Sequence, residues 1–283
     1  MLRLAEAAKA TPPGELFDIE HGRFHVIRSG VGIPVIFEGG AGEWSAHWMA
    51  VRESLGKGFQ FIAYDRLGLG WSTPTSRDRR AETLSDELVW LTNALGLDEL
   101  AILVGHSFGA SIVRLAASKV PSLFRGIVFV DGWHEAFAEW EERTGLASNS
   151  SLGARLVSQL DRFGFFRALN SVLNKLSPPK CPWKLPAAVW HEMLDISQRK
   201  SFAIAVAREA DHYSAGDQEV SAVTHLDVPI VVLVARETVR REQMPTSYPV
   251  EEHNAAWRAA SAKLASLSDC AELRMIAGTD HQI

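Results

Sequence analysis

Two patterns of apolar residues alternate along the chain. Short apolar or alternating runs predict strands, and longer segments with apolar residues three or four positions apart predict helices. The predicted strands are 15–19, 23–28, 35–37, 59–64, 101–104, 124–130, 228–234 and 271–276. The predicted helices between them are 45–55, 79–95, 110–120 and 250–267. This alternation predicts an α/β protein with a mostly parallel, twisted sheet and helices on both faces.

The alternation stops between about residues 133 and 223. Helical spacing continues there at 134–144, 152–176, 186–199 and 201–210, with no clear strand in between. The segment is too long and too helical for a loop, so we expect a helical lid inserted after the sixth strand. The expected domains are therefore a core of 1–132 and 224–283, and a lid of 133–223. Most large apolar side chains of the lid should hold it together, and we expect Trp133 to line a substrate pocket.

A sharp turn follows the predicted strand 101–104. It reads Gly-His-Ser-Phe-Gly from Gly105 to Gly109, and a segment of small residues with helical spacing comes next. A strand, a tight turn and a helix in this order lift the hydroxyl of Ser107 off the sheet, and the glycines are required because side chains would collide there. The context favours a nucleophilic Ser107 over a purely structural turn.

Other candidate catalytic or binding residues follow predicted strands. Asp131 stands at the end of strand 124–130, and a glycine-rich loop, 39–42, follows strand 35–37. Reactive groups gather at the carboxyl edge of a parallel sheet, so we expect both near Ser107. Asp65 and Arg66 follow strand 59–64, and we interpret them as ion-pairing residues that pin their loop.

Composition narrows the function classes. The 283 residues are 47 % hydrophobic and 22 % charged, and the net charge of −5 gives no electrostatic footprint for nucleic acid. The two cysteines, Cys181 and Cys270, provide neither a disulfide framework nor metal-ligand spacing. No signal peptide is evident, and apolar runs are shorter than the ~18 residues of a membrane span, so we expect a cytoplasmic protein.

Five motifs in order resemble those of the α/β-hydrolase superfamily, in particular its serine-nucleophile, esterase-like members. They are EGGAG at 38–42, DRLGLGWS at 65–72, GHSFG at 105–109, FVDGWHE at 129–135 and Gly-x-x-His at 278–281. The resemblance covers nearly the whole chain. It implies the α/β-hydrolase fold and a nucleophile, a histidine base, an orienting acid and two backbone donors.

Carried over to this sequence, the resemblance makes Ser107 the nucleophile and His281 the base. A serine hydroxyl is a weak acid, so an imidazole must take its proton as it attacks. The acid follows the seventh strand in the commonest layout, where Glu237 stands, and the sixth in a variant layout, where Asp131 stands. An aspartate held at a strand end can lock the imidazole tautomer, which favours Asp131 over Glu237. The alternative role of Asp131 is a cap on the first lid helix.

The resemblance also implies an oxyanion hole. Its donors are expected to be the N–H groups of Phe108 and Ala41, with Gly40 as the fallback for the second. Glu38 and Gly39 stand where many members have His-Gly, so other hydrogen bonds must support this loop. Neither a metal nor an organic cofactor is needed.

These features predict a serine hydrolase that cleaves carboxylic esters of small to medium apolar substrates through an acyl-enzyme. A lactonase, a perhydrolase or a carbon–carbon bond hydrolase would use the same triad. Haloalkane dehalogenase and epoxide hydrolase chemistry is disfavoured, because those relatives need an aspartate at the position of Ser107. A non-catalytic ligand-binding protein with this fold is the alternative from another class.

The sequence ends two residues after His281, where the family usually continues with a final helix. We expect the face of the sheet that this helix covers to be covered by a partner or by the N-terminal segment, unless the sequence is short. A homodimer is therefore one open possibility.

Overall fold

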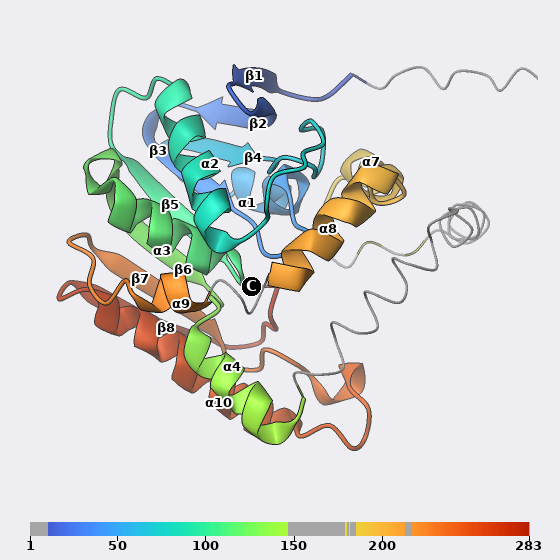
Figure 1. Cartoon of the computed structure of the whole chain (residues 1–283), viewed down its shortest axis with the longest axis vertical. Helices are drawn as coiled ribbons and strands as arrows, with labels where there is room; N and C mark the ends of the chain where they lie inside the picture. The colour runs from blue at the N-terminus through green and yellow to red at the C-terminus, as the bar shows by residue number, and fades with distance from the viewer. Residues whose placement is uncertain (1–10, 147–178, 180, 182–184, 213–216, 283) are drawn as a thin grey trace, which may run out of the picture.

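The centre of the molecule is an eight-stranded sheet, seen in the computed structural model of the chain (Figure 1). The structure describes residues 11–146, 179, 181, 185–212 and 217–282. The strands are β1 Glu15–Ile19, β2 Gly22–Gly30, β3 Gly32–Glu38, β4 Gly58–Tyr64, β5 Ala101–His106, β6 Phe124–Val130, β7 Ile230–Ala235 and β8 Ala271–Ile276.

The strands lie in the order β1-β2-β4-β3-β5-β6-β7-β8. β2 pairs antiparallel with β1 and β4, and every other pair is parallel. This arrangement confirms the predicted mostly parallel sheet. Because the parallel strands point the same way, the segments that follow β3 to β8 emerge at one edge.

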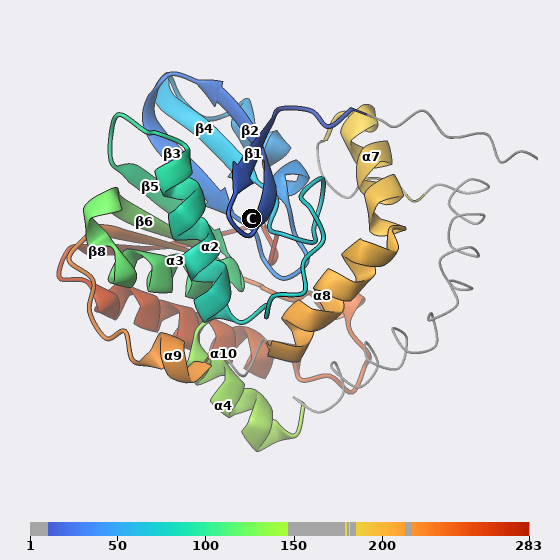
Figure 2. The same ribbon diagram turned by 45° about the horizontal axis from the view of Figure 1, so that its top comes forward.

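Helices cover both faces of this sheet. On one face, α2 (Ala81–Ala94) and α3 (Gly109–Lys119) bury a continuous apolar core against the strands (Figure 2). On the other face, the 3₁₀ turn Ser45–Trp48 and the short α1 (Met49–Arg52) pack through Trp48 onto Phe37. Helices therefore lie on both faces of the sheet, as the sequence predicted.

Four described helices fall within the expected lid, 133–223. They are α4 (Glu135–Thr144), α7 (Ala187–Ser197), α8 (Lys200–His212) and α9 (Asp217–Ser221). The helix expected at 152–176 lies outside the described residues, and α9 was not predicted. α4 packs against α10 (Val250–Lys263) through aromatic side chains, and Val220 of α9 joins the main core. The lid and its boundaries stay predictions.

None of the described helices is both long and apolar enough to cross a membrane.

Candidate active site

Ser107 sits at the sharp turn between β5 and α3. Its φ of +50° is unusual for a residue with a side chain, and its N–H donates to Val130 O at 3.2 Å. A Cβ at Gly105 would lie 2.7 Å from Gly109 O, and one at Gly109 would lie 2.7 Å from the carbonyl oxygens of Glu38 and Gly39. The turn therefore needs both glycines, as the sequence predicted, and it presents the hydroxyl at the carboxyl edge of the sheet.

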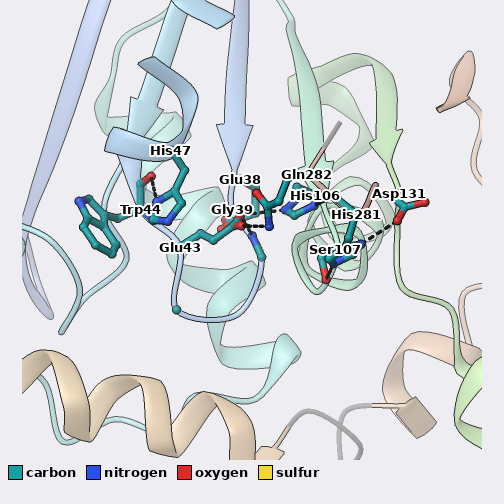
Figure 3. A network of polar contacts seen from close by, with 12 residues as sticks. Glu38, Gly39, Glu43, Trp44, His47, His106, Ser107, Asp131, His281 and Gln282 are labelled. Carbon is teal, nitrogen blue, oxygen red and sulfur yellow. Dashed lines mark hydrogen bonds and ion pairs between the residues drawn. The ribbon is translucent and has the colours of Figure 1, made fainter. Parts of the chain in front are cut away.

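His281 follows β8 and reaches Ser107 across the edge of the sheet (Figure 3). Its Nε2 lies 2.9 Å from Ser107 Oγ, and its Nδ1 lies 2.7 Å from Asp131 Oδ2. Its backbone N–H donates to Thr238 O at 3.0 Å. The structure therefore brings the three predicted triad residues into one hydrogen-bonded series, in which His281 lies between a hydroxyl and a carboxylate.

Asp131 is fully buried at the end of β6, with a φ of +41°. Its Oδ1 accepts from the N–H of Ala235 at 3.0 Å, and its own N–H donates to Leu233 O at 2.7 Å. These bonds fix the carboxylate, so Oδ2 is aimed at His281. Asp131, and not the exposed Glu237, is the carboxylate bonded to His281.

Asp131 does not cap α4, which was its alternative predicted role; His134 does. His134 precedes α4, and its Nδ1 accepts from the N–H of Ala136 at 3.0 Å. The cap on this helix is therefore an imidazole three residues after Asp131.

His106, beside Ser107, is occupied at both ring nitrogens. Its Nδ1 lies 2.8 Å from Glu43 Oε2, and its Nε2 lies 2.8 Å from His281 O. Burial opposes ionisation of both groups, but their mutual attraction is stronger, so the pKa of Glu43 is far below its usual range and the pKa of His106 is raised. Two acceptors facing one imidazole require a proton on each nitrogen. His106 is therefore a buried cation that holds the backbone of His281, not a competing base.

The glycine-rich loop has most of its N–H groups occupied. Gly40 N–H donates to Glu43 Oε2 at 2.7 Å, and Gly42 N–H donates to Glu209 Oε2 at 2.8 Å. The N–H of Ala41, between them, has no hydrogen-bond partner among the described residues. This pattern counts against Gly40 as the fallback donor and leaves Ala41 available, as expected of an oxyanion donor.

A buried guanidinium supports the same loop from behind. Arg66 donates to Gly39 O at 2.8 Å and to Gly40 O at 2.7 Å. It also pairs with the buried carboxylates of Glu38 and Glu209. Burial opposes the charge on Arg66, but the two carboxylates outweigh it, so its pKa is raised. These contacts are the different support that the Glu38-Gly39 sequence requires.

Asp65 and Arg66 form ion pairs, as expected, but with different partners. Asp65 lies against His25, with Oδ2 2.8 Å from the imidazole Nδ1, and it accepts from the N–H groups of Ser45 and Trp71. Arg66 turns instead toward the glycine-rich loop. The two residues pin two different loops through different partners.

Trp133 lies beside the site but is almost fully buried, with 3 % exposure. Its N–H donates to Ser107 O at 3.0 Å, and its ring packs against Phe137 and Trp257. The ring of Trp257 in turn meets the His281 ring edge-on at 5.2 Å between centroids. Trp133 therefore belongs to the aromatic support behind the histidine, and its predicted substrate contact stays a prediction.

Sequence reasoning missed Glu43 and Glu209 as supports of the site. Glu43 directly follows the glycine-rich loop, so an acidic residue at that position was an available signal. Glu209 is separated from Arg66 by 143 positions, and nothing in its local sequence marks it. The part of the chain that the structure describes holds no cluster of three or more metal-ligating side chains.

Comparison with known proteins adds three findings. A family model for the alpha/beta hydrolase fold matches residues 33–170. The chain is 33 % identical over 150 residues to 2-hydroxymuconate semialdehyde hydrolase of Pseudomonas sp. (strain CF600), which is 50 % of this chain and 51 % of the relative. It is 30 % identical over 143 residues to 2-(acetamidomethylene)succinate hydrolase of Mesorhizobium japonicum, half of each chain. The chain thus spans about half the length of these relatives.

A solved structure extends the likeness to most of the chain. A Pseudomonas aeruginosa protein, provisionally assigned to the epoxide hydrolases, superposes with a TM-score of 0.69 at 16 % identity. The match covers 95 % of this chain and 88 % of that one. At this identity the likeness concerns the fold.

Proposed function

The chain belongs to the alpha/beta hydrolase superfamily, and on that premise we propose that it is a serine hydrolase that cleaves carboxylic esters of small to medium apolar substrates. The proposal rests above all on one observation, the hydrogen-bonded series from Ser107 Oγ through His281 to Asp131. A serine nucleophile requires a base and a carboxylate that orients the base, whereas a turn with only a structural role requires neither.

In the proposed first step, Ser107 Oγ attacks the ester carbonyl carbon while His281 Nε2 takes the hydroxyl proton. Asp131 accepts a hydrogen bond from the Nδ1–H of His281, fixes its tautomer and stabilises the imidazolium that forms. The intermediate collapses when the imidazolium returns its proton to the leaving alcohol. Water then attacks the acyl-enzyme with His281 again as base, which releases the carboxylic acid and restores Ser107.

The negative charge that develops on the carbonyl oxygen needs two donors. We assign them to the N–H groups of Phe108, directly after the nucleophile, and of Ala41. The assignment of Ala41 is supported by its neighbours, since Gly40 and Gly42 already donate to carboxylates. A donor of this kind contributes about 10² to 10³ to kcat.

Carbon–carbon bond hydrolysis is a second candidate, because one relative is a 2-hydroxymuconate semialdehyde hydrolase. The same nucleophile, base and acid would serve, with Ser107 attacking a carbonyl carbon. The adjacent carbon–carbon bond then breaks, the departing carbon takes the proton of the His281 imidazolium, and water hydrolyses the acyl-enzyme. Comparing a p-nitrophenyl ester with a dienoic ketoacid as substrates separates the two reactions.

The central test compares the wild type with Ser107→Ala in the release of p-nitrophenol from short acyl esters. Loss of a triad nucleophile should lower kcat by about 10⁴ to 10⁶. Equal activity of the two proteins would remove Ser107 as the nucleophile. If both were inert toward esters and ketoacids, a non-catalytic ligand-binding role would replace the enzyme.

A further inference from the structure

α8 lies beside the sheet, on the right in Figures 1 and 2. Contacts near both of its ends attach it to the segment that follows β4. Directly before α8 (Lys200–His212), the Arg199 guanidinium lies 4.3 Å from the centroid of the Trp71 ring and donates to Gly70 O. Near its end, Arg208 donates to Thr75 O at 2.8 Å. α8 is therefore held by contacts that have nothing to do with the proposed reaction.

The helix also approaches two loops very closely. A Cβ at Gly68 would lie 2.8 Å from Ala205 Cβ, and one at Gly42 would lie 3.1 Å from a methyl group of Val206. These approaches bring the next turn of α8 directly behind the glycine-rich loop. Glu209 stands on that turn, and none of its surface is exposed.

The Glu209 carboxylate is engaged on both oxygens. Oε2 accepts from Gly42 N–H at 2.8 Å and from Arg66 at 2.8 Å, and Oε1 accepts from Arg66 at 2.9 Å. Arg66 in turn donates to the carbonyl oxygens of Gly39 and Gly40. One carboxylate from α8 thus fixes the last N–H of the loop directly and its first two carbonyl groups through a guanidinium.

We propose that Glu209 is a positioning residue for the oxyanion hole, which acts by fixing the peptide planes of residues 39–42 so that Ala41 N–H faces the carbonyl oxygen of the substrate. The inference rests on the proposed function. A loop with three glycines has little conformational preference of its own, so its geometry must come from outside. Small misplacements of a reacting group lower rates strongly, and the buried charges provide a rigid fixation.

The test measures the rate constant for phosphonylation of Ser107 by a fluorophosphonate, a reaction whose P=O oxygen occupies the oxyanion hole. It compares the wild type with Glu209→Ala, Glu209→Gln and the matched control Arg208→Ala. Arg208 holds the same turn of α8 through its bond to Thr75 O, and among the described residues it forms no hydrogen bond or ion pair with the glycine-rich loop. We expect Glu209→Ala to lower the rate constant and kcat by about 10- to 100-fold with KM changed less than about threefold, since one oxyanion donor contributes 10² to 10³.

Arg208→Ala should keep the wild-type rate within about threefold, even if it lowers the melting temperature. Glu209→Gln, which keeps one acceptor oxygen but no charge, should fall between the wild type and Glu209→Ala, and it answers the question if the alanine variant does not fold. Rates of both Glu209 variants equal to that of Arg208→Ala, or a loss confined to KM, would overturn the inference. Failure of the wild type itself to label at Ser107 would instead overturn the proposed function.

Discussion

Two residues of the site, Ser107 and Asp131, have positive φ angles although neither is glycine. Such backbone strain costs about 1–3 kcal/mol per residue and persists only where the surroundings impose it. Here the strand neighbours impose it, through the bonds from Ser107 N–H to Val130 O and from Asp131 N–H to Leu233 O. The strain aims both side chains at His281.

The proposed role of Asp131 as the acid of a triad can be tested at the level of single residues. Asp131→Asn should lower kcat by about 10⁴, because an amide can donate to Nδ1 and so stabilise the wrong tautomer. Glu237→Gln should leave kcat within about threefold of the wild type, since Glu237 is exposed. Measuring kcat for ester hydrolysis in both variants distinguishes the two carboxylates. A larger loss of kcat in Glu237→Gln would assign the acid to Glu237 instead.

The buried pair of His106 and Glu43 predicts a pH-dependent contribution to folding. The pKa of His106 is raised above its ordinary 6.5, so its contribution is complete below about pH 6.5 and is lost as the pH rises through the raised value. The pKa of Glu43 is depressed below its ordinary 4.5, so its contribution is complete above that pH and is lost on acidification. The window of full stabilisation is therefore about pH 4.5 to 6.5.

Glu43→Gln removes the charge but keeps an acceptor for Gly40 N–H. It should lower the free energy of unfolding by about 3 kcal/mol at pH 6, as expected for breaking a buried pair. The loss should shrink at pH 9, because a neutral His106 in the wild type no longer forms an ion pair with Glu43. Urea unfolding at both pH values measures this, and a difference that grows with pH would contradict a cationic His106.

At the level of elements, the strands and most helices could be predicted from the spacing of apolar residues. The predicted strand 124–130 is β6 without change, and the predicted helix 110–120 is α3, which starts and ends one residue earlier. α9 could not be predicted, because five residues are too few for a helical period. The predicted helix 250–267 ends as α10 at Lys263, and a 3₁₀ turn completes it.

The turn between β5 and α3 makes a sharp prediction about packing. Gly109→Ala would put a methyl group 2.7 Å from two carbonyl oxygens of the neighbouring loop, which would force the backbone apart. It should lower the free energy of unfolding by about 2–3 kcal/mol, in the range of overpacking. Gly56→Ala is the matched control, because nothing lies within 4 Å of its Cβ and its φ is not positive, so its effect should stay within about 0.5 kcal/mol. Equal effects of the two substitutions would show that the turn tolerates a side chain.

At the level of the whole molecule, the sheet unites residues that are far apart in sequence. Asp131 is 150 positions from His281, and Ser107 is 174 positions from it. Their convergence could be predicted because all three follow parallel strands, whose carboxyl ends share an edge. The supports of the glycine-rich loop could not be predicted, because glutamates and arginines are common and only the packing of α8 decides which of them are buried together.

The most direct test of the account is the mass of the protein after treatment with a fluorophosphonate. The wild type should gain one phosphonyl group, and peptide mapping should locate it on Ser107. The gain should vanish in Ser107→Ala and become at least about 10³-fold slower in His281→Gln, which lacks the proposed base. A label on another residue, or unchanged labelling in His281→Gln, would contradict a serine nucleophile activated by this histidine.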